Sequence, residues 1–181
     1  MAKATKKKKA SKKKSPIDKA VLVSDRVEII DVRVIKCKYH QTPMSGKGKR
    51  DIIFDVTTKA RLEKELNLIL VFPTFKMEAR LEKSKDSSPN IVIEAEFLLI
   101  YEIKNLEGIK KDNIEAFGRI NGIYNAWPYW REFVQDTIAR MGLPRLTVPV
   151  FRLMPSSEAN KKKRPPKSAK KTKKKKKTKK S

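Results

Sequence analysis

Hydrophobic and polar residues alternate along four segments of the chain, and this pattern predicts four β-strands. The segments are 27–39, 52–56, 66–81 and 91–103, and the last alternates most regularly, with apolar side chains on one face and glutamates on the other. Short connections separate the segments, so we predict that consecutive strands pair as an antiparallel meander.

Three features predict irregularities or breaks in this sheet. The first segment changes phase between Val34 and Ile35, which favours a β-bulge or a sharp twist there. Pro73 has no backbone N–H to donate, so an edge strand or a bulge is expected at that point. The segment 40–50 has the glycines and proline of a loop, and 60–65 has the pattern of a turn or a short helix.

After the fourth strand the hydrophobic period changes from two to about 3.6, which predicts one long helix. Asp112 and Glu115 have the spacing of a capping box, and Gly142 is placed to end the helix. Gly118 and Gly122 lie four residues apart, so they permit a close backbone approach between this helix and another element.

Prolines mark the remaining part of the pattern. Pro128 is expected to interrupt the helix, while Pro144 and Pro149 exclude a helix and disfavour a central strand in the apolar segment 143–151. We therefore predict an α+β fold, in which one long helix packs on the four-stranded sheet and an extended, proline-containing crossover loop follows it. One helix cannot cover both faces of such a sheet, which implies either oligomerisation or an exposed apolar groove.

Charge is concentrated at the two ends of the chain. The 181 residues carry a formal net charge of +25, with eight lysines and no acid in residues 1–15, and thirteen lysines, one arginine and no acid in residues 160–181. Residues 16–159 are nearly balanced and numerous enough to bury one core. We predict one domain over 16–159 between two disordered, lysine-rich tails, 1–15 and 160–181.

The tails are expected to attract nucleic acid or another polyanion in a salt-dependent way, because lysine binds phosphates as a point charge and reads no bases. A role in solubility alone is the other interpretation of this composition. The candidate polyanion-binding residues are Lys6, Lys7, Lys8, Lys9, Lys12, Lys13, Lys14, Lys161, Lys162, Lys163, Arg164, Lys173, Lys174, Lys175, Lys176 and Lys177.

Few residues of this sequence are suited to catalysis. The single cysteine, Cys37, and the single histidine, His40, cannot make a zinc site, and His40 is expected to be an exposed loop residue. Phosphate-binding glycine loops and metal-ligand spacings are absent from the sequence, so we expect neither an enzyme nor a cofactor. The apolar runs are too short to span a membrane and no secretory signal follows the first lysines, which favours a cytoplasmic protein.

Two motifs stand at a fixed distance from each other in the last third of the chain. The first is Pro-Tyr-x-Arg-Glu, at 128–132, and the second is Pro-x-Leu-x-x-Pro, at 144–149. In these motifs the chain resembles SecB, the bacterial protein-export chaperone, and its SecB-like relatives. Their spacing, after four antiparallel strands, is more specific than either motif alone, and the similarity covers most of residues 20–153.

The resemblance implies an ATP-independent holdase that associates as a dimer of dimers, a tetramer. Family members bind unfolded chains or preproteins in long grooves between the helix, the crossover loop and the sheet. An apolar lining of this kind accepts many extended peptides, because burial of apolar surface reads no exact sequence. Carried over to this chain, the groove residues are Phe72, Phe75, Phe97, Tyr101, Trp127, Trp130, Leu143, Leu146, Val148 and Phe151.

The same resemblance implies further partners and leaves an alternative function open. Besides unfolded clients and other copies of this chain, the SecA motor and toxin–antitoxin pairs are the partner classes of such proteins. The alternative keeps the SecB-like domain only as an oligomeric scaffold, on which the polycationic tails bind nucleic acid or the ribosome. The two functions are compatible, and the sequence does not choose between them.

Overall fold

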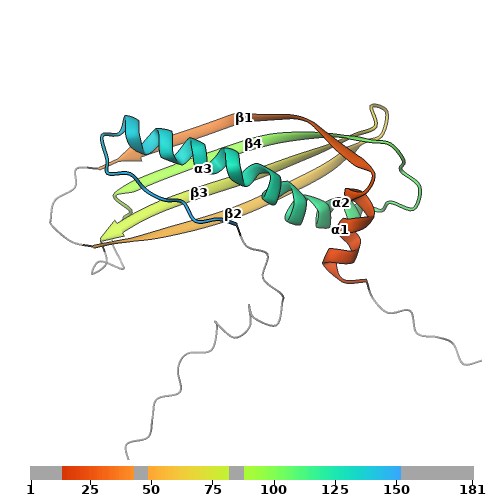
Figure 1. The fold of residues 1–181 in the computed structure, drawn as a ribbon, viewed down its shortest axis with the longest axis horizontal. Helices are drawn as coiled ribbons and strands as arrows, with labels where there is room; N and C mark the ends of the chain where they lie inside the picture. Colours follow the sequence, from red (N-terminus) through yellow and green to blue (C-terminus); the bar gives the residue numbers. More distant parts are fainter. Residues whose placement is uncertain (1–13, 43–48, 82–87, 152–181) are drawn as a thin grey trace, which may run out of the picture. The chain divides into compact units, whose positions relative to one another are not determined.

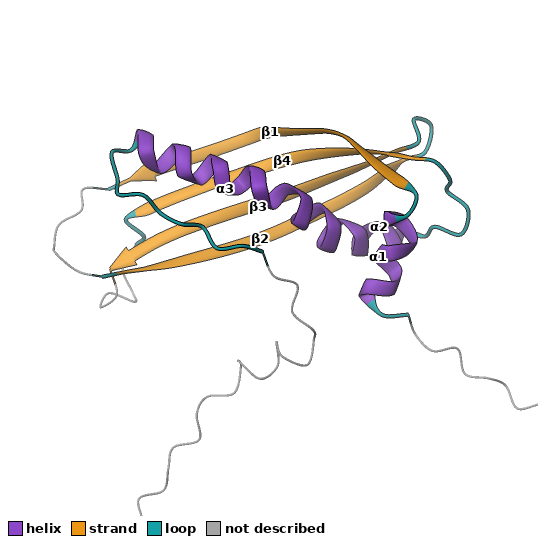
Figure 2. Cartoon of the chain, in the orientation of Figure 1, coloured by secondary structure: helices purple, strands orange, loops and turns teal. Residues whose placement is uncertain are grey.

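The structure of the chain is a computed structural model that describes residues 14–42, 49–81 and 88–151. The described residues up to Val150 belong to one compact unit, and Phe151 belongs to a second. The first unit is α+β, as predicted, with four strands and one long helix (Figures 1 and 2). We call this continuous helix, residues 111–140, the helical arm. In chain order its elements are α1 (Pro16–Ser24), β1 (Val27–Gln41), β2 (Arg50–Glu63), β3 (Leu68–Leu81), β4 (Ile91–Ile103), α2 (Lys111–Phe117), the π-helical turn η1 (Gly118–Gly122) and α3 (Ile123–Arg140).

The four strands form one antiparallel sheet in the order β1-β4-β3-β2. The predicted meander order is therefore wrong in one respect, since β1 pairs with β4 rather than with β2. The burial of the strands explains the order. β4 has the most buried side chains and lies between two neighbours, while the more exposed β1 and β2 take the edges.

β1 carries two bulges along its pairing with β4. One register shift lies between Val34 and Lys36, which confirms the bulge that the change of phase predicts. A second shift lies between Ile29 and Asp31, and the sequence pattern did not indicate it. Each bulge adds one unpaired residue to β1, so the strand bends and twists along the edge of the sheet.

Two local predictions for the middle of the sheet are wrong. Pro73 lies inside β3, an internal strand, where it pairs with Thr58 of β2. The pairing of β3 with β4 skips Phe72 and Pro73 and continues in the same register, so the missing N–H interrupts the ladder without shifting the strand. The turn or helix predicted over 60–65 is wrong for residues 60–63, which pair with β3 and continue β2 to Glu63, and the turn is confirmed only for residues 64 and 65.

The helical arm begins two residues earlier than the predicted cap, Asp112, would place it. The N-cap residue is Lys110, whose backbone N–H donates to Asn113 Oδ1 at 2.9 Å. The predicted cap, Asp112, instead accepts from Lys19 Nζ of α1 at 2.9 Å. Gly142 follows the end of α3 with a φ of +68°, which confirms the predicted end of the helix.

Pro128 lies inside α3 and does not interrupt it, contrary to the prediction. A proline in a helix removes one hydrogen bond to the carbonyl four residues earlier, here that of Tyr124. Pro128 and Tyr124 are both exposed, so water can replace the lost partner at low cost. α3 therefore continues to Arg140 across one face of the sheet (Figure 2).

Two glycines bring the start of the arm directly onto the sheet, as predicted. A Cβ atom on Gly118 would lie 2.7 Å from Ala60 Cβ of β2, and one on Gly122 would lie 2.5 Å from Val71 Cγ1 of β3. Both distances are shorter than any ordinary carbon–carbon contact, so only glycine fits at this separation.

The short helix α1 was not predicted, although its start has a clear pattern. Ser15 Oγ accepts from the Asp18 N–H at 3.1 Å, and Asp18 Oδ2 accepts from the Ser15 N–H at 2.9 Å, which is a capping box with Pro16 at the first helical position. Ala20 is buried, and the carbonyl of Lys19 accepts from Asn113 Nδ2 of α2 at 3.1 Å. α1 thus packs against the start of the arm.

Residues 1–13 and 152–181 lie outside the described residues, so the predicted disorder of the tails and the domain limits 16–159 stay predictions. Among the helices that the structure describes, none combines the length and the apolar character that crossing a bilayer requires.

Candidate functional site

An aromatic cluster joins α3 to the sheet. The side chain of Trp130 is fully buried and stacks on Phe75 of β3, with ring centroids 5.4 Å apart and an interplanar angle of 13°. Phe75 also meets Phe97 of β4 and Trp127 edge-on, at 5.8 and 5.7 Å. These rings fill the space between helix and sheet, and they set the distance at which α3 lies above the strands.

The loop formed by residues 143–150 turns back along α3 on the side of β2 (Figure 1). Two side chains one helical turn apart fix its far end: Trp127 Nε1 donates to the Pro149 carbonyl at 2.9 Å, and Arg131 Nε donates to the Val148 carbonyl at 3.1 Å. The Val148 side chain is fully buried. The arginine of the first motif and the tryptophan just before it therefore bind the second motif, which explains the fixed spacing of the two motifs.

A groove lies between this loop and the sheet, and we call it the loop-side groove. It has a volume of about 220 Å³ and takes its lining from β2, β3, β4, the end of α3 and the loop. The lining is apolar apart from two arginines, and its residues are Arg50, Ile52, Met77, Ala79, Ile91, Ile138, Leu143, Pro144, Arg145 and Leu146.

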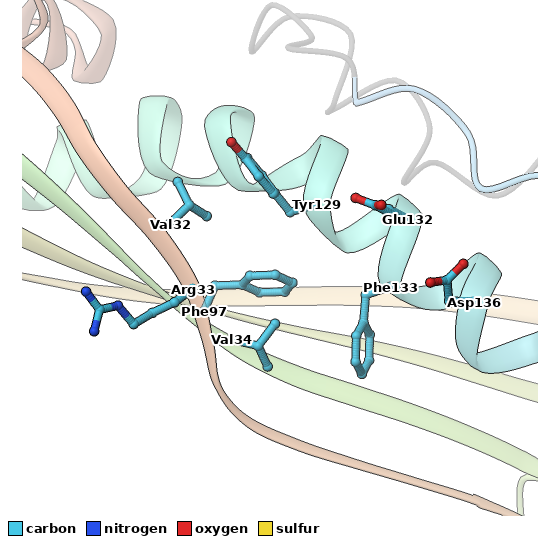
Figure 3. Close-up of a pocket in the computed structure, with 8 residues that line it drawn as sticks. All are labelled: Val32, Arg33, Val34, Phe97, Tyr129, Glu132, Phe133 and Asp136. Carbon is cyan, nitrogen blue, oxygen red and sulfur yellow. The ribbon is translucent and has the colours of Figure 1, made fainter. Parts of the chain in front are cut away.

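A second groove, of about 230 Å³, lies on the other flank of α3, and we call it the β1-side groove (Figure 3). Glu132 and Asp136 project from the helix at its border, whereas the Arg33 guanidinium points away from it and pairs with Asp31. The lining residues are Val32, Arg33, Val34, Phe97, Tyr129, Glu132, Phe133 and Asp136.

The structure distributes the ten predicted groove residues over several environments. Leu143 and Leu146 line the loop-side groove, and Phe97 contributes to the β1-side groove. Trp127 is half-buried and binds the loop. Four other predicted groove residues belong to the core between the helix, the loop and the sheet. They have at most 2 % of their surface exposed, and they are Phe75, Tyr101, Trp130 and Val148.

Phe72 lies on the face of the sheet opposite to α3, where the Arg61 guanidinium lies 5.4 Å from its ring centroid. The sequence prediction placed Phe72 in the same groove as Phe75, because a change in the alternation at Pro73 would bring both side chains to one face. Because β3 keeps its register there, residues three apart point to opposite faces. Phe151 is the last described residue and belongs to the second unit.

Sequence reasoning missed most of the loop-side lining. The apolar side chains of Ile52, Met77, Ala79 and Ile91 come from three strands that meet under the loop. The β2–β3 and β3–β4 pairs that bring these strands together are also those of the predicted meander, and alternation shows that the residues share a face. What the pattern does not show is the course of the loop over this end of the sheet, which depends on its contacts with Trp127 and Arg131.

The shifted pKa values of Tyr101 and Glu78 each have a clear physical cause. Burial raises the pKa of Tyr101 to about 12, while its hydroxyl oxygen accepts from Asn125 Nδ2 at 3.0 Å. On the opposite face, hydrogen bonds from Lys76 and then Arg80 lower the pKa of Glu78. The glutamate is therefore part of a charged network that faces away from both grooves.

Cys37 and His40 do not form a dyad. Both lie in β1, so the prediction that His40 belongs to a loop is wrong, because β1 pairs with β4 as far as Gln41. The two side chains are exposed and alternate to opposite faces of the sheet. Within the described part of the chain, no three His, Cys, Asp or Glu residues are placed to bind a metal ion.

Of the candidate polyanion-binding residues, only Lys14 is described, and it is exposed. The other fifteen lie outside the described residues, and polyanion binding by the tails stays a prediction.

The fold is similar to a solved structure of the Mycobacterium tuberculosis Rv1957 SecB-like chaperone in complex with a ChAD peptide from the Rv1956 HigA1 antitoxin. The TM-score is 0.61 at 19% sequence identity, over 75% of this chain and 98% of that chain. A protein of unknown function from Streptococcus agalactiae aligns with a TM-score of 0.35 at 12% identity, over 68% of this chain and 96% of that one. No protein-family model and no curated protein matches the sequence. The four-stranded antiparallel sheet with one long helix thus matches a SecB-like fold.

Proposed function

We propose that this chain is a molecular chaperone of the holdase type, which binds unfolded segments of other proteins in the loop-side groove without using ATP. The observation that carries the proposal is the apolar groove itself, formed by a loop that Trp127 and Arg131 bind to α3. Eight of its ten lining residues are apolar, among them Leu143 and Leu146. A lining of this kind buries apolar side chains without selecting one sequence.

The comparison supports a chaperone of this kind. The SecB-like chaperone with the similar fold is bound to a peptide from an antitoxin. Its likeness to this chain concerns the fold, so the use of the loop-side groove for unfolded chains or preproteins is our proposal. A SecA-type motor and a toxin–antitoxin pair are the partner classes that it extends to, in the cytoplasm, and the proposal includes no catalytic step.

Self-association is part of the proposal, because the outer edge of β1 has no partner strand among the described residues. Ile29, Ile35 and Tyr39 are between 45% and 52% exposed on this strand. A long edge strand with exposed apolar side chains is a surface that proteins cover. We propose that a second copy covers it and that two such dimers form the tetramer. Light scattering of the full chain tests this, and a monomer would contradict it.

An aggregation assay tests the holdase function. A chemically unfolded, aggregation-prone protein is diluted into buffer with the full chain, and light scattering follows its aggregation. We expect suppression by the wild type and at least tenfold weaker suppression by Leu146→Asp, since a carboxylate in the apolar lining would lose its hydration when a client binds.

The matched control is Thr147→Asp, which adds the same charge at the next residue, an exposed one outside the groove lining. Circular dichroism shows whether each variant is folded. A wild type that suppresses nothing would refute the holdase function, and equal loss in both variants would refute the loop-side groove as the site.

A second function is favoured by the charge of the sequence, in which residues 1–15 and 160–181 carry 22 of the 25 net positive charges. We propose that these tails bind nucleic acid or ribosomal RNA independently of the groove. Binding of an RNA to the full chain should fall steeply with salt, because each contact releases counterions. Replacing the lysines of 161–163 and 173–177 by glutamine should reduce the salt dependence, and an unchanged slope would contradict this role.

A further inference from the structure

The two grooves that flank α3 have opposite charge. In the loop-side groove the charged residues of the lining are Arg50 and Arg145, and no acidic residue lines it. In the β1-side groove the Arg33 guanidinium points away, so the charged groups at its border are the carboxylates of Glu132 and Asp136 (Figure 3). The positive charge of the loop-side groove is therefore a local property and does not follow from the net charge of the chain.

The arginines of the loop-side groove have no acidic partner in the described part of the chain. Arg50 is half-buried, and its Nε–H group is buried without a hydrogen-bond acceptor. The next residue, Asp51, pairs with Arg80 in the ladder and so points to the opposite face of the sheet. Arg145 is exposed at the border formed by the loop. Arg80 on the opposite face has a buried Nε–H group without an acceptor as well, so this feature is not specific to the groove. What distinguishes the groove is that two guanidinium groups line it and no carboxylate does.

We propose that the loop-side groove selects client segments in which aspartate or glutamate side chains flank apolar ones. This inference rests on the proposed holdase function and adds the class of segment that is bound. The apolar lining takes the apolar side chains, and the guanidinium groups of Arg50 and Arg145 bind the carboxylates. Arginine suits this role because its planar fork donates two parallel hydrogen bonds to one carboxylate.

The two arginines lie next to apolar lining residues, and this position determines which charge on a client segment is favoured. Ile52, Met77 and Ile138 lie in the same lining, so a bound segment would bury its apolar side chains next to the guanidinium groups. Removal of water from this region strengthens the attraction between unlike charges and also the penalty for a lysine of the client. The groove should therefore favour acidic segments and reject basic ones.

Three fluorescent peptides with one apolar core and different flanking residues test the inference. The flanks are glutamate, glutamine or lysine, and binding to the full chain is measured by fluorescence anisotropy. We expect the lysine-rich tails to attract the acidic peptide in every variant. Two matched variants therefore separate the contribution of the groove from that of the tails. Arg145→Glu changes the groove, and Arg140→Glu makes the same charge change at an exposed residue of α3 outside the lining.

We expect Arg145→Glu to lower the preference for the glutamate over the lysine peptide by about tenfold, which corresponds to about 1.4 kcal/mol. Arg50→Gln should lower the same preference, and Arg140→Glu should leave it close to the wild-type value. Equal effects of Arg145→Glu and Arg140→Glu would show that general charge sets the preference, and this would overturn the inference.

The glutamine peptide separates failure of the inference from failure of the proposed function. If it binds and Arg145→Glu does not alter the charge preference, only the inference is overturned. If none of the three peptides binds, the holdase function fails with it. If Arg145→Glu changes the mass of the full chain in light scattering and leaves all peptide binding unchanged, a second copy of the chain occupies the groove, and the inference is overturned.

Discussion

The helical arm packs on the sheet in two different ways along its length. In its first half, Gly118 and Gly122 place the backbone directly against Ala60 and Val71. In its second half, large rings such as Trp130 lie between the helix and the strands. Both grooves flank this second half, whereas a cleft beside the first half is lined mainly by polar and charged residues, among them Lys59, Lys111 and Arg119.

The comparison shows how one arm can be fixed on the sheet and still leave grooves along its sides. Glycine removes the side chain and fixes a close approach between helix and strand. Aromatic side chains increase the separation, and the space on each side of them becomes a groove. The loop 143–150 then borders one of these grooves through its contacts with Trp127 and Arg131.

The largest expected effect comes from removal of the ring that separates the second half from the sheet. Trp130→Ala should lower the free energy of unfolding by about 3–5 kcal/mol, because the side chain is fully buried and stacks on Phe75. Urea unfolding of the full chain measures this loss. Tyr129→Ala, at the exposed neighbouring residue, should cost less than about 1 kcal/mol, and equal losses would contradict the role of Trp130 as the spacer.

The junction of the two halves should lose stability at high pH. Tyr101 packs edge-on against Phe117 at 4.9 Å, and burial raises its pKa to about 12. Between about pH 10 and about pH 12 the unfolded chain releases the phenol proton and the folded chain keeps it. The stabilisation is complete below this window and falls as the pH rises through it, by about 3 kcal/mol at most.

Tyr101→Phe isolates this contribution from the titration of the many lysines. The difference in the free energy of unfolding between wild type and variant should be constant below about pH 10 and should shift in favour of the variant above it. A difference that stays constant throughout would show that Tyr101 titrates normally in the folded chain.

The close approach in the first half of the arm predicts that replacing a glycine by alanine lowers the free energy of unfolding. Alanine usually stabilises a helix by about 1 kcal/mol relative to glycine. Gly122→Ala should instead destabilise the chain by about 1–3 kcal/mol, because the new Cβ atom would lie 2.5 Å from Val71 Cγ1.

A double variant tests the cause of this effect. In the Val71→Ala background the Cγ1 atom is absent, so Gly122→Ala should become neutral or stabilising in the same urea experiment. If Gly122→Ala stabilises the wild-type background, the two halves of the arm do not differ in their distance from the sheet.

The smallest expected effect concerns the loop. Trp127→Phe keeps an aromatic ring but removes the donor to the Pro149 carbonyl, which should cost about 1 kcal/mol. Hydrogen exchange should therefore become faster in residues 143–150 while β4 stays unchanged. Faster exchange throughout the sheet would mean that the bond supports the whole fold rather than the loop.

Local pattern predicted the elements of this fold better than their arrangement. Alternation located β4 at Ile91–Ile103 and indicated the bulge after Val34, because each depends on neighbouring residues. The order β1-β4-β3-β2 depends on pairing between segments far apart in the chain, which alternation does not reveal. The same limit explains Phe72, whose face depends on whether Pro73 shifts the register of β3.

The candidate site was predicted through its motifs rather than its surroundings. The resemblance to SecB led to Leu143, Leu146 and Trp127, which the structure brings to the loop and its border. The two arginines were missed, because nothing in the local sequence places Arg50 of β2 beside Arg145 of the loop. Charge on a groove is set by tertiary structure, and a lone arginine in a sequence is most often a solvated residue.

Hydrogen exchange of the full chain with and without an unfolded client tests the central claim most directly. The account predicts that the client slows exchange in residues 143–150 and in the first residues of β2, which border the loop-side groove. β1, which lines the groove on the other flank of α3, should change little. Protection confined to that other flank, or to the lysine-rich ends, would contradict binding in the loop-side groove.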